Sequence, residues 1–289
     1  MIEELIKQQL KDKYGDFTLV PLTGGYTNQT FLLKGIIPFL VVKAGSSHNE
    51  DFQNEVNCLK IIEGNSVPKI YELIELKAHH LIVMEYRSGK NGQSLLDDLN
   101  IEKAKRLYKE LGESLSKDIH SLKYNHIPDG VREGKLDPLQ TDLGFIPSEL
   151  FNISKETLKE LTDSREEWVL THGDYGPHNV LLTEDHHLTV LDWEWSEWGN
   201  PLSDIGWICW FTSLHYPEIS DTLIPLFFEG YLANQSINLS AKKLKAYCIY
   251  KVWKVLVRIE NAPIEVKQEW MRRLKWTIET DIFHLSIFK

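Results

Sequence analysis

The sequence predicts a two-lobed α+β protein, in which a small β-rich lobe (1–86) precedes a larger, mainly helical lobe (93–289). Short apolar runs separated by turn-prone residues fill the first part of the chain, a pattern typical of β-strands. Residues 87–92, RSGKNG, form a polar stretch with two glycines and are the expected linker. Apolar residues then recur mostly at helical spacing, which predicts the second lobe.

Strands with one inserted helix are expected in the first lobe. Two apolar stretches flank the turn-prone TGGYTN within residues 17–35, which predicts a hairpin. A third apolar run, FLVVKAG, carries Lys43 near its end. Residues 49–64 place apolar side chains at helical spacing and end on a glycine, which predicts the helix. Two further strands are expected at 67–76 and 79–86.

The second lobe is expected to be helical with one embedded hairpin. An amphipathic helix is predicted over 101–120, with Asn100 as its cap, and a charged helix over 154–167. Residues 126–150 are rich in Pro and Gly and are expected to form a loop. The runs VLL and LTVLDW, separated by TEDHH, predict the hairpin. Beyond residue 203 helices are expected, with breaks near Pro217 and Pro263.

Composition excludes several classes of protein. The 289 residues carry a formal charge of −10, which disfavours nucleic acid and anionic membranes and is compatible with a cationic substrate. No apolar run is long enough to span a membrane, and the opening MIEELIKQQL does not resemble a secretion signal. Three cysteines with no paired spacing argue against a disulfide framework and a structural zinc site. They therefore favour a reducing cytoplasm.

The segment HGDYGPHN at 172–179, followed by DWE at 192–194, is the strongest chemical signal. Phosphoryl transfer needs oxygen ligands for a metal that bridges the phosphates, and a carboxylate that accepts the proton of the attacking hydroxyl. Asp174 is the candidate base, and Asn179, five residues on, can lend a neutral oxygen to Mg²⁺. Asp192 would bring an anionic ligand to the metal from the end of the hairpin.

HGDxxxxN followed by LDWE resembles the aminoglycoside phosphotransferase and choline kinase superfamily, the small-molecule relatives of protein kinases. The resemblance extends over nearly the whole chain. It implies a bilobal protein-kinase-like fold, with ATP and Mg²⁺ in the cleft between the lobes. The expected reaction is transfer of the γ-phosphate to a hydroxyl of a small molecule.

The resemblance also implies roles for residues of the first lobe. Lys43 would meet the α- and β-phosphates, and Glu55 would hold that lysine, with Glu50 as a rival partner. Gly24 and Gly25 would let the hairpin backbone approach the phosphates, because no Cβ interferes. The adenine is expected beside the main chain of Met84, Glu85 and Tyr86, just before the linker.

Other residues are expected to support the catalytic loop rather than to react. His172 would shape the loop and pack beneath it, and Asp204 would anchor the loop backbone through hydrogen bonds. Gly173 stands where protein kinases usually carry an arginine, which argues against control by activation-loop phosphorylation. The segment after Asp192 has no Ala-Pro-Glu, so a peptide-docking platform is not evident.

The acceptor stays open at this point. Five of the nine tryptophans lie between Trp193 and Trp210, and Trp195 and Trp198, interleaved with Glu194 and Glu197, are tentative substrate residues. An aminoglycoside, and with it antibiotic resistance, is favoured by the resemblance and the overall acidity. Choline, ethanolamine or another amino alcohol or sugar metabolite is the alternative, because tryptophan rings attract quaternary ammonium groups. A nucleotide-binding regulator without turnover and a protein kinase are remote alternatives. The sequence does not decide whether the nucleotide is ATP or GTP, or whether the protein is a monomer or a homodimer.

Overall fold

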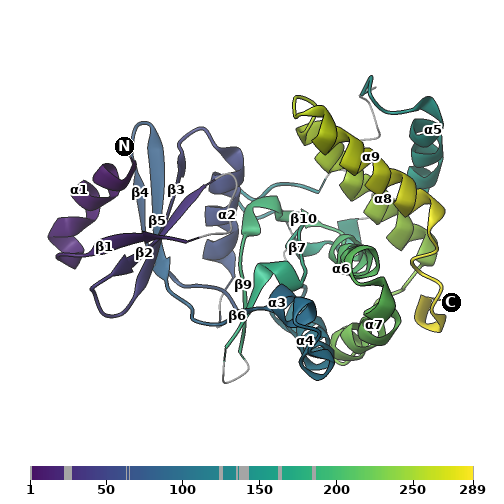
Figure 1. Ribbon diagram of the computed structural model, residues 1–289, viewed down its shortest axis with the longest axis horizontal. Helices are drawn as coiled ribbons and strands as arrows, with labels where there is room; N and C mark the ends of the chain where they lie inside the picture. Colours follow the sequence, from purple (N-terminus) through teal and green to yellow (C-terminus); the bar gives the residue numbers. More distant parts are fainter. Residues whose placement is uncertain are drawn as a thin grey trace.

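The computed structural model has the predicted two-lobed α+β fold, with an N-terminal lobe built on an antiparallel sheet and a helical C-terminal lobe (Figure 1). The residues described are 2–22, 28–62, 64, 66–123, 126–134, 136, 143–161, 165–183 and 187–288. Within these ranges, no helix combines the length and the apolar character that crossing a membrane requires. The limits of the lobes at residues 86 and 93 stay a prediction.

The N-terminal lobe is a five-stranded antiparallel sheet in the order β1-β2-β3-β5-β4, with a helix on each face. Its elements are α1 (Ile2–Tyr14), β1 (Thr18–Pro21), β2 (Gln29–Lys34), β3 (Leu40–Ser46), α2 (Glu50–Ile61), β4 (Ile70–Glu75) and β5 (His79–Glu85). The predicted hairpin, helix and later strands are therefore present. The helix α1 is an addition to the single helix expected, because Ile6 and Leu10, one turn apart, bury their side chains on the sheet.

The alternation of side chains along β3 directs Lys43 to the active-site face. Leu40, Val42 and Ala44 pack in the cluster that contains α1, whereas Val41 packs with α2 on the opposite face. Lys43 shares the parity of Val41 and points toward α2 as well. In Figure 1, α2 lies on the side of the sheet that faces the C-terminal lobe.

The C-terminal lobe packs its helices around two small sheets, ordered β6-β8-β9 and β10-β7. Its helices and strands are β6 (Lys90–Asn91), α3 (Gly92–Asp97), α4 (Ile101–Ser114), α5 (Ser148–Thr157), β7 (Val169–Thr171), β8 (Val180–Leu182), β9 (Leu188–Val190), β10 (Glu197–Gly199), α6 (Leu202–His215), α7 (Pro217–Leu232), α8 (Ala241–Arg258) and α9 (Ile264–Glu279). A π-helical turn follows α4 (Leu115–Ile119), and 3₁₀ turns lie at Leu158–Glu160, Arg165–Glu167, Pro177–Asn179, Trp193–Trp195 and Ser286–Phe288.

Most helix signals in this lobe are confirmed, and one is wrong in its bounds. The Asn100 side chain accepts from the Lys103 amide at the start of α4, and the helices break at Pro217 and before Ile264. The charged helix predicted over 154–167 instead begins at Ser148, directly after a proline that favours a helix start. It ends at Thr157, and the 3₁₀ turn that follows is not continued into a helix.

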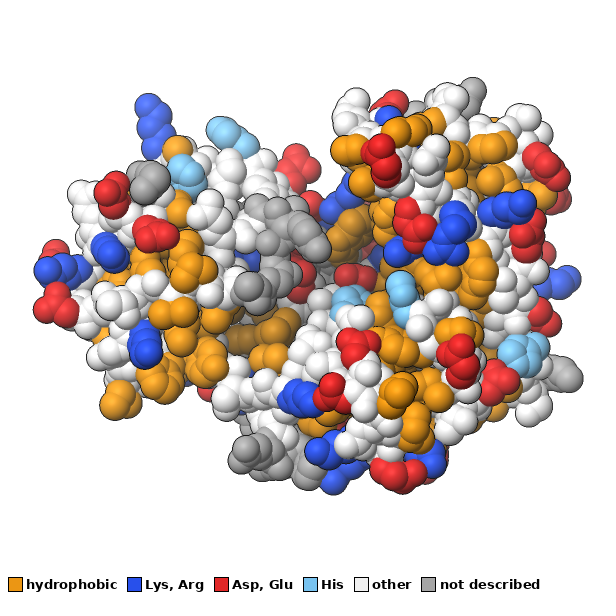
Figure 2. Space-filling model, viewed as in Figure 1, with side chains coloured by type: hydrophobic (Ala, Val, Ile, Leu, Met, Phe, Trp, Pro, Cys, Tyr) orange, Lys and Arg blue, Asp and Glu red, His pale blue; other side chains and the backbone are white. Residues whose placement is uncertain are grey.

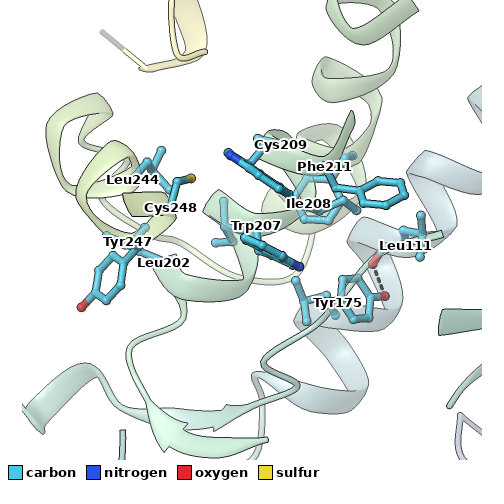
Figure 3. Packing of buried hydrophobic residues seen from close by; sticks show 14 of the residues in the cluster. Leu111, Tyr175, Leu202, Trp207, Ile208, Cys209, Phe211, Leu244, Tyr247 and Cys248 are labelled. Atoms are coloured by element: carbon cyan, nitrogen blue, oxygen red, sulfur yellow. Dashed lines mark hydrogen bonds between the residues drawn. The ribbon is translucent and has the colours of Figure 1, made fainter. Parts of the chain in front are cut away.

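The helix α6 lies in the middle of the lobe and is buried along most of its length (Figure 3). Its Trp207, Ile208 and Phe211 belong to the main hydrophobic core. Tyr175, from the segment between β7 and β8, joins the same core and donates a hydrogen bond from its hydroxyl to the Leu111 carbonyl of α4, at 2.9 Å. The core therefore connects α4 and α6 directly to the segment that carries Asp174.

Candidate active site

The Asp174 carboxylate is held by three neighbouring side chains. Trp207 Nε1 donates to Oδ1 at 2.7 Å, and Asn179 Nδ2 donates to Oδ2 at 3.0 Å. His178 Nε2 lies 3.3 Å from Oδ2. Burial alone would raise the pKa of Asp174, but His178 and the nearby charge of Lys251 outweigh burial and hold that pKa well below its usual range. Asp174 is therefore a fixed and ionised carboxylate.

Asp204, in the first turn of α6, binds the backbone of the loop that carries Asp174. Its carboxylate accepts from the His172 amide at 2.7 Å and from the Gly173 amide at 2.8 Å. His120 Nε2 lies 3.2 Å from the same carboxylate. This is the anchoring arrangement predicted for Asp204, and it orients the loop without touching the carboxylate of Asp174.

His172 lies beneath the loop, fully buried. Its Nε2 lies 2.9 Å from the Leu191 carbonyl, and its Nδ1 accepts from the Asp174 amide at 3.1 Å. Burial lowers the pKa of His172, which fits a neutral ring that donates through Nε2 and accepts through Nδ1. The ring thus links the two loops, as a supporting rather than a reacting group.

Asn179 and Asp192 come from two loops that meet. The Leu191 amide donates to the Asn179 carbonyl at 2.8 Å. The amide nitrogen of Asn179 is engaged by Asp174, which leaves its Oδ1 as the oxygen that could meet a metal. Asp192 adopts a left-handed backbone (φ 64°), and its side chain keeps about a third of its surface exposed. Among the described residues no three His, Cys, Asp or Glu side chains gather as a metal cage. One carboxylate and one amide nevertheless suit Mg²⁺, which keeps waters and phosphate oxygens as its other ligands.

Lys43 connects the N-terminal lobe to Asp192, the candidate metal ligand. Its Nζ lies 2.5 Å from Glu55 Oε2 and 3.4 Å from Asp192 Oδ1. Burial lowers the pKa of Lys43, but the charges of Glu55 and Asp192 outweigh it and the pKa is raised. Glu55, and not the exposed Glu50, is thus the partner of Lys43 on α2.

The other nucleotide-side predictions are less closely defined by the structure. Gly24 and Gly25 lie outside the described residues. At the end of β5, the Glu85 amide donates to the Lys69 carbonyl and the Tyr86 amide donates to the Phe39 carbonyl, at 2.8 and 3.3 Å. Both amides are engaged within the lobe, and the placement of adenine beside them stays a prediction.

The tentative substrate residues do not form one open surface. Glu194 is buried, and its charge acts on Lys43, so it belongs with the nucleotide side of the cleft. Glu197 Oε2 accepts from Lys254 Nζ at 2.6 Å, and Trp198 is buried in β10. The Trp195 ring lies 3.5 Å from the Arg258 guanidinium and 5.5 Å from Lys251 Nζ. Their role in substrate binding stays a prediction.

Two residues near Asp174 were not predicted as site residues. Trp207 lies one turn after Asp204 on α6, so a single helix face holds both the loop backbone and the carboxylate of Asp174. The Trp207 ring also packs in the core, where it stacks on Trp210 with centroids 4.3 Å apart. Lys251, on α8, carries no motif, and only its place in an otherwise apolar stretch of a helix could have drawn attention to it.

Comparison with known proteins decides the family. The sequence profile of the phosphotransferase enzyme family, APH, matches residues 18–240. The chain belongs to this family. This membership agrees with the phosphoryl transfer that the sequence motif predicted.

Solved structures with the same fold include proteins of two kinds. Spectinomycin phosphotransferase APH(9)-Ia, in complex with ADP and spectinomycin, has a TM-score of 0.68 and 18% identity, with 97% of each chain covered. A choline/ethanolamine kinase family protein from Mesorhizobium loti has a TM-score of 0.65 and 14% identity, with 100% of this chain and 97% of that one covered. These likenesses show the fold.

Among curated proteins, acyl-CoA dehydrogenase family member 11 of Rattus norvegicus is 27% identical over 238 residues. The match covers 73% of this chain and 30% of the relative. The chain therefore spans about a third of the length of the curated relatives that it matches.

Proposed function

We propose that this phosphotransferase moves the γ-phosphate of ATP to a hydroxyl of a small molecule, in a reaction that needs Mg²⁺. One observation carries the proposal. Lys43, held by Glu55, reaches Asp192, while the loop that contains Asp192 is bonded to the loop that contains Asn179 and Asp174. A cation that could bind phosphate, two oxygens that could hold a metal and a fixed carboxylate are thus brought together, as phosphoryl transfer requires.

The residues present fit ATP and Mg²⁺. Asn179 Oδ1 and the Asp192 carboxylate would hold Mg²⁺, which supplies positive charge to the phosphate oxygens when bound. Lys43 would orient the α- and β-phosphates, with Gly24 and Gly25 covering them and the main chain of Glu85 and Tyr86 beside adenine. Support for ATP comes from the ADP in the structure of spectinomycin phosphotransferase.

Asp174 orients the acceptor hydroxyl and takes its proton late in the transfer. A carboxylate whose pKa is held low is a weak base toward an alcohol in the ground state. It is, however, always ionised and aligned by Trp207 and Asn179. Alignment and preorganised charge supply most of the rate in phosphoryl transfer, because its transition state is loose. The complete set of these residues argues against a regulator without turnover.

Two acceptor classes follow from the family. An aminoglycoside is supported by the likeness to spectinomycin phosphotransferase, and an amino alcohol by the likeness to the choline/ethanolamine kinase family protein. Both acceptors are cationic. Lys251, Lys254 and Arg258 lie around Trp195 and Asp174, so the charge of this region gives neither class direct support. Antibiotic resistance, cytoplasmic location and oligomeric state stay predictions.

Replacement of the base tests the reaction. Asp174→Ala should lower kcat by about 10²- to 10⁴-fold, because general-base and positioning effects are lost together. ADP release would be measured against hydroxyl acceptors, and Mg·ATP binding by calorimetry. Binding of the nucleotide should stay within a few-fold of wild type, because the carboxylate faces the acceptor. Normal phosphate transfer by the variant would show that Asp174 has another role.

A further inference from the structure

Lys251 is a buried cation that has no anionic partner in contact among the described residues. It lies on α8 with 7% of its surface exposed. Its Nζ lies 5.1 Å from the centre of the Trp207 ring and 5.5 Å from that of Trp195. Within the part of the chain that the structure describes, Nζ makes no hydrogen bond and no ion pair. Two aromatic faces attract an ammonium group but do not replace the hydrogen bonds that it makes in water.

Lys251 lies beside the catalytic carboxylate, on the side away from the metal ligands. Trp207, which it contacts, donates to Asp174 Oδ1, whereas Asn179 donates to Oδ2. Asp174, Lys254, Asp204 and Glu197 are the charged groups that act on Lys251. The charged groups that act on Lys43 are instead Glu55, Asp192 and Glu194. Lys251 therefore faces the place where an acceptor, and not the nucleotide, meets Asp174.

Lys251 is the first of three cations that we call the α8 row, which consists of Lys251, Lys254 and Arg258. They recur at helical spacing and lie on one face of α8. Lys254 is paired with Glu197, and Arg258 is paired with Asp51 of α2. Lys251 differs from these two, because no carboxylate among the described residues is in contact with it. Figure 2 shows the hollow between the lobes, with Lys or Arg side chains on its right-hand wall and acidic ones at its floor.

We propose that Lys251 binds a carboxylate of the acceptor, so that the substrate is a small hydroxy acid rather than a cationic amine. The inference rests on the proposed phosphotransferase function and adds the charge of its acceptor. An incoming carboxylate would complete the ion pair of a cation that the fold has already removed from water. One ammonium balances one negative charge, which favours a carboxylate over a doubly charged phosphate ester.

The same geometry opposes a quaternary ammonium acceptor. The Trp195 ring is already occupied by Arg258 and Lys251, and Trp207 by Lys251. A further cation on these rings would meet like charges at short range. An aromatic cage for choline would need these faces to be free.

The test compares hydroxy acids with their uncharged amides. ω-Hydroxycarboxylates from glycolate to 6-hydroxyhexanoate, the matching amides, and ethanolamine, choline and kanamycin would be titrated into the protein with ADP and Mg²⁺, and assayed for ADP release with ATP. We expect at least one carboxylate to bind at least tenfold more tightly than its amide. Lys251→Met should remove that preference and raise KM for the acid about 10- to 100-fold, as expected for a lost charge-assisted hydrogen bond.

Matched variants separate acceptor binding from other roles of Lys251. Lys242→Met changes an exposed lysine of the same helix and should leave the preference intact. Lys251→Arg keeps the charge and should retain part of the preference for the acid. If Lys251→Met lowers kcat equally for acids and amides, Lys251 only supports Asp174 and the inference is wrong. The inference is also wrong if no carboxylate binds better than its amide, or if the amines are preferred. Failure to bind Mg·ATP would instead contradict the proposed phosphotransferase function.

Discussion

The two sides of the Asp174 carboxylate present opposite charge. On the nucleotide side, one lysine of β3 meets carboxylates, which are Glu55, Asp192 and Glu194. On the acceptor side, the three cations of the α8 row outnumber their two carboxylate partners, Glu197 and Asp51. An excess of acid suits a site completed by metal cations, whereas an unpaired cation suits a site completed by an anion. The overall charge of −10 conceals this division.

The largest loss of activity is expected from a substitution on the nucleotide side of Asp174. Asp192→Asn removes the proposed anionic metal ligand and one of the carboxylates near Lys43. We expect kcat/KM to fall by about 10³-fold, or roughly 4 kcal/mol of transition-state stabilisation. Steady-state kinetics over a range of Mg²⁺ concentrations would measure it. Asp16→Asn, at an exposed position, is the control, and equal kinetics for both variants would remove Asp192 from the metal site.

The second effect concerns the cost of the unpaired cation. Burial lowers the pKa of Lys251 to about 8, so the folded state binds this proton more weakly than the unfolded state does. Lys251→Met should therefore raise the free energy of unfolding at pH 7 by on the order of 1–3 kcal/mol. The penalty is fully present below pH 8 and is lost as pH rises toward the unfolded value near 10.5.

Urea unfolding at pH 7 and pH 10 would measure this gain, with Lys242→Met as the reference. A variant that is less stable than wild type at pH 7 would show that Lys251 is already satisfied within the protein. The comparison between the two sides of Asp174 would then lose its main support.

The third effect sharpens the role of α6. Trp207→Phe keeps most of the ring but removes the hydrogen bond to Asp174 Oδ1. We expect kcat to fall about tenfold with little change in KM for ATP, because one hydrogen bond to a charged group is worth roughly 1.5 kcal/mol. Trp210→Phe breaks a comparable bond, to Thr277, that does not touch Asp174. Trp210→Phe should lower thermal stability but leave kcat nearly unchanged. If kcat fell in Trp210→Phe and not in Trp207→Phe, groups other than Trp207 would orient Asp174.

The smallest effect is expected at the end of the α8 row. Arg258→Gln breaks the ion pair with Asp51, which joins α8 to α2 across the two lobes. Because both side chains are partly exposed, and Arg132 also pairs with Asp51, stability should fall by only about 0.5–1 kcal/mol, and less at high salt. Thermal unfolding at two ionic strengths would check this. A loss that does not respond to salt would point to the contact with Trp195 instead.

Sequence reasoning predicted the pairing of Lys43 with Glu55 and the meeting of the two loops, because these residues lie at fixed spacing in short segments. Asp174 and Asn179 share one loop, and the parity of β3 directs Lys43 toward Glu55. The acceptor side depends on a helix that lies more than 50 residues further along the chain. Nothing in the local pattern of α8 shows that Lys251 lies on the Trp207 ring near Asp174, since the contact with Trp207 arises only when α8 packs on α6.

The same limit explains why the surroundings of the clustered tryptophans could not be predicted from the sequence. Their clustering in the sequence indicated a surface for cations, but it could not show that the protein places its own cations there. The bounds of α5 were missed for a different reason. Charged residues at 159–167 have high helix propensity, and the described part of this stretch nevertheless forms 3₁₀ turns, at 158–160 and 165–167.

Gly173 limits the substitutions that this protein could acquire in its catalytic loop. Its φ of +78° is unfavourable for any other residue, and an added Cβ would lie 2.0 Å from the Trp195 carbonyl oxygen. The arginine that regulated kinases carry at this position could not be introduced by a single substitution, because the turn around Trp195 would first have to move. Acquiring phosphorylation control would thus require several coordinated changes, and a chain built in this way is expected to remain constitutively competent.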